Sequence, residues 1–345
     1  LRDLMGFYTI RLKSSVQINS LSSPAPDLRA YQRWLDDYLS SEECKRDQDF
    51  WTNLFPETIQ SFDFPTDHSR PSIFTFKGAR YHLPADPEIL KQCLDIGRSQ
   101  RMTPFMTMIS LYTLWIHKLT GRDEVVIGFP VSGRFFEDSD DLVGYCTHLV
   151  PFASRYDADI SFVEYLKRSK ETLTAAYKHQ KYPFGQLIRN LQFEQDMSRG
   201  SIISSEFNLD QVQDIPPLEG LALSMIDIPL SYVKYDFNLE IMAVAGQYQF
   251  KFEYASDLFE QSAVECMAKH FMTLLAEVAG NPQKSLKKIS LLTLEERNLI
   301  LIAWNNTYRD FPLDKPFHRL FEQQVELSPD RIAASFAEPN NKVVE

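Results

Sequence analysis

The segment of residues 103–129 constrains the fold of this chain more than any other. Thr103 is placed to cap a helix, Pro104 suits the first helical position, and apolar residues then recur at intervals of three and four. Gly121 is placed to end this helix. The near-continuous apolar run of residues 124–129 predicts a strand that is buried on both faces. A buried helix followed by a buried strand predicts a layered fold around a large core.

Further helices and strands alternate along the chain. Helices are expected over residues 28–54 with a break, from the capping box at Ser161 to Lys178, from Asp257 to Gly280, and over residues 293–304 and 317–325. Strands are expected over residues 79–83, 202–209, 237–245, 247–254 and 332–336, with a hairpin at Ala245-Gly246. This alternation predicts an α/β fold in which helices cover a mixed sheet.

The composition excludes several classes of protein. With 44% hydrophobic and 24% charged residues, the 345-residue chain is globular and not disordered. A net charge of −11 without clustered Lys and Arg argues against a nucleic-acid partner. No apolar run reaches the roughly 18 residues that span a bilayer, and the four cysteines form no Cys-x-x-Cys pair. We therefore expect a cytoplasmic protein with reduced cysteines, no metal site and no membrane partner.

Four short motifs follow one another along the chain: Gly128-Phe-Pro-Val-Ser-Gly-Arg134, Val143-Gly-Tyr-Cys-Thr-His148, His179-Gln-Lys-Tyr-Pro-Phe184 and Asp196-Met-Ser-Arg199. In that order and at about that spacing, they resemble the second half of the condensation domain of nonribosomal peptide synthetases. The whole segment of residues 103–134 is similar to this family. The resemblance implies the fold of chloramphenicol acetyltransferase, duplicated into two lobes with a tunnel between them, of which this chain holds the C-terminal lobe.

The resemblance also implies a reaction. The family forms an amide bond between a carrier-bound acyl or peptidyl thioester and a carrier-bound aminoacyl amine. The implied partners are the upstream and downstream peptidyl carrier domains and an adjoining adenylation domain. The implied cofactors are the phosphopantetheine arms of those carrier domains, with none bound directly. Two tethered substrates that meet in a tunnel gain most of their rate from proximity and orientation.

The family's His-His-x-x-x-Asp-Gly segment does not occur in this sequence, whose seven histidines include no adjacent pair. In the family, the second His positions or deprotonates the attacking amine. The segment lies just ahead of a helix that residues 1–8 resemble. We therefore expect this chain to be a piece of a longer polypeptide. The piece is expected to contain no catalytic residue and to be inactive when isolated.

The resemblance divides the chain into four parts. Residues 1–22 are expected to hold the end of the N-terminal lobe and a connector, and residues 23–285 the C-terminal lobe. A linker is expected over residues 286–313, and residues 314–345 would begin an adenylation domain.

Three residues are candidates for the tunnel or its surroundings. Asn208 can both donate and accept hydrogen bonds, so it could hold substrate or a group near the family's histidine. His148 stands where many family members carry Asn. We favour a strand histidine with a satisfied partner over a tunnel contact for it. The resemblance places Arg134 at the end of a strand that enters the tunnel floor, where a guanidinium can fix a loop through several donors.

The motif around His179 predicts a structural corner and not a catalytic base. Pro183 is expected at a helix start and Phe184 in the core. Lys181 stands where the family usually has an acidic residue.

Three charged residues are also assigned structural roles. Asp196 and Arg199 are spaced for a local ion pair that shapes a turn, and an exposed pair of this kind contributes under about 1 kcal/mol. Asp236 is expected to lie opposite a basic group.

Two alternatives stay open. The chain could be a non-catalytic lobe on which carrier proteins dock, or a relative that carries out epimerisation or heterocyclisation. The segment after Pro312 that resembles an adenylation domain favours condensation over epimerisation. An intact histidine segment upstream of Leu1 would favour the enzyme over the docking lobe.

Overall fold

The computed structural model forms two units, Leu1–Thr293 and Leu294–Glu345. It describes the following residues: 8, 26–55, 59, 61–191, 196–211, 220–221, 226, 228–244, 247–310, 314–332, 335–337 and 343–344. Apart from Tyr8, the helix expected over residues 1–8 and the connector after it lie outside the described residues, as does the turn expected at residues 245–246.

A six-stranded mixed sheet forms the centre of the first unit, with the order β1-β6-β5-β4-β2-β3. Its strands are β1 Gly78–Pro84, β2 Glu124–Val131, β3 His148–Arg155, β4 Ser205–Gln211, β5 Phe237–Val244 and β6 Gln247–Ala255. β4 runs parallel to both β2 and β5, and the other neighbouring strands are antiparallel. β4 therefore lies in the middle of the sheet, between β5 and β2, although β2 is far from it in the sequence.

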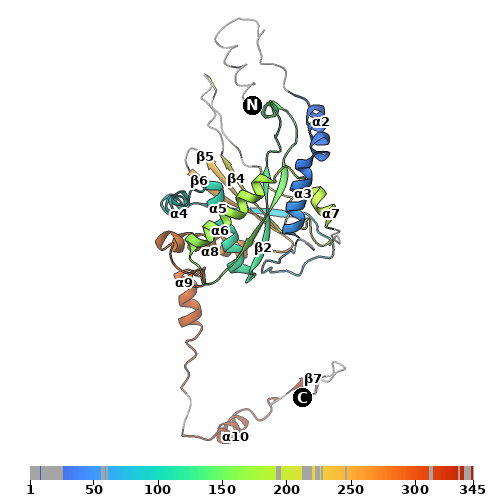
Figure 1. Cartoon of the computed structure of the whole chain (residues 1–345). Coiled ribbons are helices and arrows are strands. Elements are labelled where there is room, and N and C mark those ends of the chain that lie inside the picture. The colour runs from blue at the N-terminus through green and yellow to red at the C-terminus, as the bar shows by residue number, and fades with distance from the viewer. Residues whose placement is uncertain are drawn as a thin grey trace. The chain divides into compact units, whose positions relative to one another are not determined.

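The helices of the first unit are α2 Leu28–Leu39, α3 Glu42–Leu54, α4 Pro87–Ser99, α5 Pro104–Thr120, α6 Phe162–Lys178, α7 Phe184–Asn190 and α8 Gln261–Gly280. α5 contacts β2 and β4, α8 contacts β1 and β6, and α6 contacts β3, so these helices cover one face of the sheet (Figure 1). α7 packs against β3, and α3 packs against α7.

The two faces of the sheet differ in chemistry. Phe237, Leu239 and Ile241 of β5 are fully buried under the helices. The residues that alternate with them, Asn238 and Glu240, point to the opposite face because side chains alternate along a strand. That face is polar on β4, β5 and β6, and it carries the candidate site.

Trp115 on α5 joins the helices to the sheet. Its ring centroid lies 5.6 Å from that of Phe237, 6.2 Å from that of Phe252 and 5.8 Å from that of Phe271 on α8. Buried aromatic rings in tilted and edge contacts contribute large apolar areas. Through this cluster, the sheet and the helices that cover it share a single hydrophobic core.

Several local predictions are confirmed. The Thr103 hydroxyl accepts a hydrogen bond from the Met106 amide at the start of α5, and Gly121 ends that helix with a φ of 67°. The Ser161 hydroxyl accepts from the Glu164 amide at the start of α6. The predicted α/β fold with helices over a mixed sheet is thus what the chain adopts.

Other details differ from the sequence-based expectation. Helix α4 was not predicted, although Asp86 caps it and Pro87 is its first residue. β4 begins at Ser205 and not at residue 202. Glu260, not Asp257, is the N-cap of α8, and the Asp257 carboxylate instead accepts a hydrogen bond from the Thr75 hydroxyl at 2.6 Å.

The second unit contains α9 Leu294–Asn298, a π-helical turn Leu299–Ala303, α10 Phe317–Leu327, and the paired strands β7 Phe336–Ala337 and β8 Val343–Val344. The strand predicted from residue 332 begins only at residue 336. Leu286 and Ile289, within the stretch expected as a linker, are buried in the core of the first unit. The four expected domain boundaries stay predictions.

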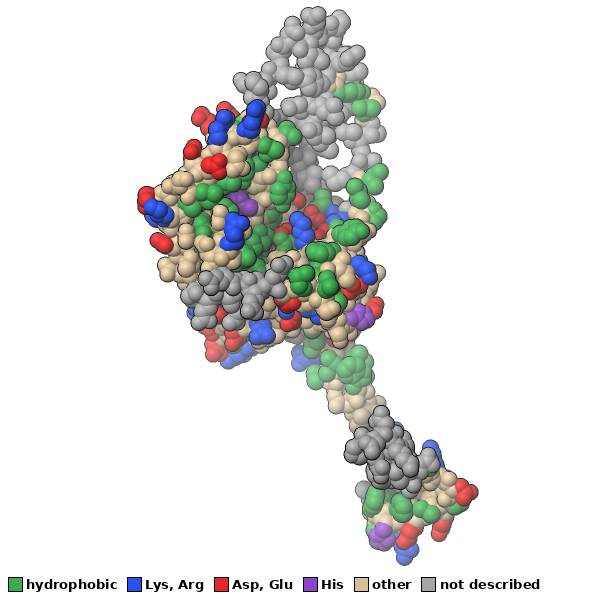
Figure 2. Space-filling model, turned by 90° about the vertical axis from the view of Figure 1, so that its right-hand side faces the viewer, with side chains coloured by type: hydrophobic (Ala, Val, Ile, Leu, Met, Phe, Trp, Pro, Cys, Tyr) green, Lys and Arg blue, Asp and Glu red, His purple; other side chains and the backbone are tan. Residues whose placement is uncertain are grey.

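Charged side chains of both signs are interspersed on the face shown in Figure 2. None of the helices in the described part of the chain is both long and apolar enough to cross a membrane.

Candidate functional site

A pocket of about 370 Å³ opens on the polar face of the sheet. Its walls come from β2, β3, β4, the start of β5, β6 and the segment of residues 232–235. His148 and Asn208, two of the three residues predicted for the tunnel, both line it. Their roles there stay predictions, but the fold brings them to one cavity from strands 60 residues apart.

Asn208 reaches the pocket because of its position on β4. Its neighbour Phe207 is fully buried beneath α5. Alternation along the strand therefore turns the Asn208 side chain to the polar face.

His148 is the first residue of β3, and its imidazole is half-buried. The Nε2 atom lies 2.6 Å from the Gln180 carbonyl oxygen and donates to it. Burial lowers the pKa of His148, although this hydrogen bond opposes the shift. The predicted satisfied partner of the strand histidine is therefore confirmed, and the neutral imidazole is favoured.

Arg134 fixes the loop that follows β2. Its guanidinium donates to the carbonyl oxygens of Ser139 at 2.5 Å and Leu142 at 2.8 Å. The preceding Gly133 has a φ of 67°, and a Cβ there would lie 1.9 Å from the Cys146 carbonyl oxygen. The loop contact predicted for Arg134 is confirmed, whereas the residue does not line the pocket.

His179 lies at a tightly held corner after α6. Its Nδ1 atom is 2.7 Å from an oxygen of the buried Asp47 carboxylate, and its ring stacks on Phe50 with centroids 4.0 Å apart. The Trp51 indole N–H donates to the His179 carbonyl at 2.9 Å. Three residues of α3 thus hold the backbone and the ring of His179, as a structural corner requires.

The residues that follow His179 complete the corner with one difference from the prediction. Pro183 is the N-cap of α7, and the helix begins at Phe184. Phe184 is half-buried against the core and not fully enclosed. The Lys181 ammonium forms an ion pair with Glu43 at 2.9 Å, which accounts for a basic residue at this position.

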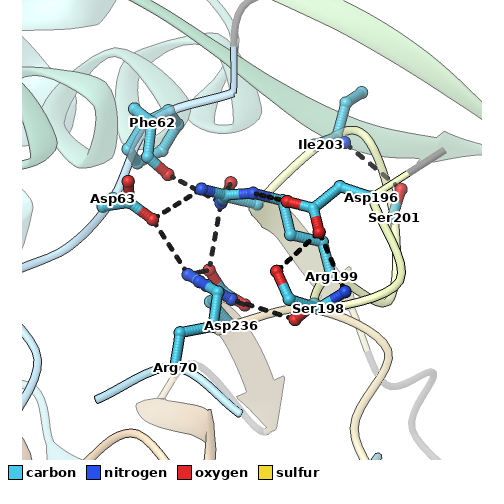
Figure 3. Close-up of polar contacts among 10 residues, drawn as sticks. Phe62, Asp63, Arg70, Asp196, Ser198, Arg199, Ser201, Ile203 and Asp236 are labelled. Atoms are coloured by element: carbon cyan, nitrogen blue, oxygen red, sulfur yellow. Dashed lines mark hydrogen bonds and ion pairs between the residues drawn. The ribbon is translucent and has the colours of Figure 1, made fainter. Parts of the chain in front are cut away.

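The ion pair between Asp196 and Arg199 is part of a larger network (Figure 3). The Arg199 Nε donates to Asp196 at 3.2 Å, and Asp196 also accepts from the amide and hydroxyl of Ser198. Arg199 is only 12% exposed and forms a second ion pair with Asp63 at 2.7 Å. The predicted local pair is confirmed, and its arginine is too buried for the figure given for an exposed pair to apply.

Asp236 lies opposite two arginines in the same network. Arg70 binds both carboxylate oxygens of this buried residue at 3.0 and 2.6 Å, and Arg199 approaches within 3.7 Å. Arg70 also pairs with Asp63 at 3.0 Å. Burial would raise the pKa of Asp63, but the hydrogen bonds and charges of Arg199 and Arg70 hold it below its usual range.

Sequence reasoning missed several residues of these sites. Arg70 and Asp63 pair with each other across seven residues of loop, which no helix or strand spacing predicts, and their other partners, Asp236 and Arg199, are more than 130 residues away. Glu206, which lines the pocket, could have been found, since it lies two residues before Asn208 on the same face of a strand. Among the described residues up to Thr293, no three His, Cys, Asp or Glu side chains come close enough to share a metal ion.

Comparison with known proteins assigns this architecture to a family. The model of the condensation-domain family matches residues 1–301. The chain belongs to the condensation-domain family. Its curated relatives include bacitracin synthase 3 of Bacillus licheniformis, 30% identical over 307 residues, and gramicidin S synthase 2 of Brevibacillus brevis, 30% identical over 302 residues. These matches cover 89% and 87% of this chain but only 5% and 7% of the synthases.

Solved condensation domains share its fold. A four-domain nonribosomal peptide synthetase bound to AMP and glycine matches with a TM-score of 0.75 at 18% identity, covering 90% of this chain and 25% of that one. The first condensation domain of the calcium-dependent antibiotic synthetase matches with a TM-score of 0.67 at 18% identity, covering 83% and 61%. The predicted chloramphenicol-acetyltransferase-like fold is therefore confirmed.

Proposed function

We propose that this condensation domain takes part in amide-bond formation within a nonribosomal peptide synthetase. In this reaction, the amine of a carrier-bound aminoacyl group attacks the carbonyl of a carrier-bound acyl or peptidyl thioester. The C–N bond forms, the C–S bond breaks, and the proton lost by the amine ends on the released thiol. The substrates arrive on the phosphopantetheine arms of upstream and downstream peptidyl carrier domains.

The observation that carries this proposal is the family match over residues 1–301. The pocket lined by His148 and Asn208 supports it, because it supplies polar groups that can orient a substrate on the face of the sheet that the helices leave open. The orientation of two tethered groups can lower the barrier by several kcal/mol, on the order of 7–11 kcal/mol in favourable cases.

The test is a condensation assay with the polypeptide that contains this domain and two loaded carrier proteins. Amide formation, detected by mass spectrometry, is expected only when both carriers are loaded. Absence of product with the complete polypeptide would contradict the proposal.

We further propose that the 345-residue chain is inactive alone, because its sequence holds no His-His-x-x-x-Asp-Gly segment. In the same assay, it is expected to form amide at the uncatalysed rate. We also propose that residues 314–345 begin an adenylation domain. Sequencing beyond residue 345 tests that assignment directly, since the family's adenylation motifs should follow.

A second candidate function is docking of another protein without catalysis. It is supported by the likeness in fold to the X-domain from teicoplanin biosynthesis, solved in complex with OxyB, with a TM-score of 0.72 at 18% identity over 85% of this chain. Carrier-protein binding by the complete polypeptide without amide formation would favour this function over condensation.

A further inference from the structure

The pocket on the polar face holds a carboxyl group that the assignments above do not use. Glu206 lies on β4 beside Asn208, and both side chains line the cavity. Its backbone N–H donates to the Asn238 side-chain oxygen at 2.9 Å, which ties this point of β4 to β5. The Glu206 side chain therefore projects from a fixed position in the middle of the sheet.

Glu206 differs from Glu253 and Glu240 of this face in its partners. Glu253, in the same pocket, pairs with Arg80 at 2.6 Å, and Glu240 lies 3.9 Å from Lys251. The Tyr235 side chain lies beside the Glu206 carboxylate in the pocket and lowers its pKa, and among the described residues no Lys, Arg or His side chain forms an ion pair with this carboxylate.

The surroundings of Glu206 favour a cationic ligand. Burial raises the pKa of this carboxyl group, and the charges of Glu253 and Glu240 raise it further, against the effects of Tyr235 and of Lys234, which also lines the pocket. A partly buried carboxylate without an ion-pair partner has lost hydration, and the charge of Lys234, which forms no ion pair with it, replaces that hydration only in part. A bound cation would supply that interaction.

An ammonium group is a cation that substrates of the proposed reaction carry. It is compact, and it offers several donors to a carboxylate and to side-chain oxygens such as that of Asn208. The pocket of about 370 Å³ is large enough for an aminoacyl group.

We propose that Glu206, oriented by Tyr235, binds an ammonium group of the aminoacyl substrate in this pocket. The inference rests on the proposed function for the identity of the substrate. The ammonium could be the α-amino group that later attacks the thioester or a basic side chain of the amino acid. In either case Glu206 is a binding residue that sets which substrates enter.

Binding measurements on the 345-residue chain test this inference without any condensation step. Three probes are titrated by calorimetry, each an amino acid linked through a stable amide to pantetheine in place of the thioester. A glycyl probe carries only the α-ammonium, an Nα-acetyl-lysyl probe only the side-chain ammonium, and an N-acetylglycyl probe neither. The probe that binds better than N-acetylglycyl identifies which ammonium the pocket accepts.

We expect one charged probe to bind about tenfold more tightly than the N-acetylglycyl probe, which corresponds to about 1.4 kcal/mol. Glu206→Gln keeps the size and hydrogen-bonding capacity of the side chain but removes the charge, and it should abolish this advantage. Tyr235→Phe should reduce it, because the carboxylate loses the group that orients it.

Glu240→Gln is the matched control. It removes the same charge from the same face of the neighbouring strand, but Glu240 does not line the pocket. The tenfold advantage should survive in this variant. If Glu240→Gln abolishes the advantage equally, general negative potential and not contact with Glu206 explains it, and the inference is wrong.

Equal binding of all three probes, binding of none at millimolar concentration, or an unchanged advantage in Glu206→Gln would each overturn the inference. Far-UV circular dichroism and the thermal midpoint establish that the variants are folded. A complete polypeptide that forms no amide would refute the proposed function and leave these binding results intact.

Discussion

Arg70 and Asp236 form a two-pronged ion pair, with nitrogen–oxygen distances of 3.0 and 2.6 Å. Arg70 belongs to the loop before β1, and Asp236 immediately precedes β5. The Asp236 side chain is 3% exposed and that of Arg70 is 18% exposed. Because Tyr235 of the pocket immediately precedes Asp236, this ion pair holds one wall of the pocket to a distant loop.

We expect Arg70→Lys to lower the free energy of unfolding by about 1–3 kcal/mol, because an ammonium cannot reproduce the two parallel hydrogen bonds that the Nη1 and Nη2 atoms make to the buried carboxylate. Arg70→Ala should cost more, about 3–5 kcal/mol, since it leaves the Asp236 charge without this partner. Urea unfolding followed by circular dichroism measures both.

Arg98→Lys is the control for these variants. Arg98 pairs with Asp95 on the surface of α4 and its side chain is 79% exposed. A change within about 0.5 kcal/mol is expected. Equal losses for Arg98→Lys and Arg70→Lys would show that the two-pronged geometry contributes nothing.

Local signals predicted the helix ends well and the long-range contacts poorly. Thr103 and Gly121 bound α5 as expected because capping depends on residues within one turn. The ion pair of Arg70 and Asp236 joins residues 166 apart, and no spacing rule reaches that far. The sequence could predict a basic partner for Asp236 but not which one.

The pocket was predicted only in part for the same reason. Period-two alternation relates Glu206 to Asn208, so both could be assigned to one face from the sequence. That His148 lines the same cavity depends on the strand order, in which β2 separates β3 from β4. The order of strands in a mixed sheet follows from tertiary packing and is not encoded by any one motif.

The buried His117 should make stability depend on pH. It is 2% exposed, and its ring nitrogens contact the Arg122 carbonyl at 2.7 Å and the Ser154 hydroxyl at 3.0 Å. Burial lowers the pKa of His117 to about 4. The unfolded state binds a proton on this histidine near pH 6.5, whereas the folded state binds it only near pH 4. The free energy of unfolding therefore falls as the pH drops from about 6.5 to 4, by at most about 3 kcal/mol from this group.

The measurement is the urea midpoint at pH 7 and pH 5 for the parent and for His117→Gln. The variant should be less stable at pH 7 but should lose less stability on acidification. His318→Gln, an exposed substitution on α10, should keep the parent's pH dependence. An unchanged pH dependence in His117→Gln would mean that other groups cause the acid sensitivity.

Asn208→Ala should slow condensation by the complete polypeptide. Asn208 lines the pocket, and the loss of one hydrogen bond to a substrate corresponds to about a tenfold loss of rate, or about 1.4 kcal/mol. The rate of adenylation, measured by pyrophosphate exchange, should not change.

Asn53→Ala, an exposed substitution on α3, is the matched control and should leave the rates of condensation and adenylation unchanged. Equal condensation rates for Asn208→Ala and the parent would exclude Asn208 from the tunnel.

Arg134→Lys should lower the thermal midpoint of the complete domain together with its activity. The Nη1 atom of the guanidinium donates to both the Ser139 and the Leu142 carbonyl, and a lysine ammonium, which ends one bond nearer the backbone on a flexible stem, does not reach the same fixed point. The loss of a charged hydrogen bond should cost about 1–3 kcal/mol.

Arg155→Lys is the control. It changes an exposed arginine that pairs with Glu124 and should leave both the thermal midpoint and the activity unchanged. Because Arg134 does not line the pocket, we expect its effect on activity to follow from displacement of the loop after β2. A fall in activity at a constant midpoint would instead mean that Arg134 contacts the substrate or the catalytic segment.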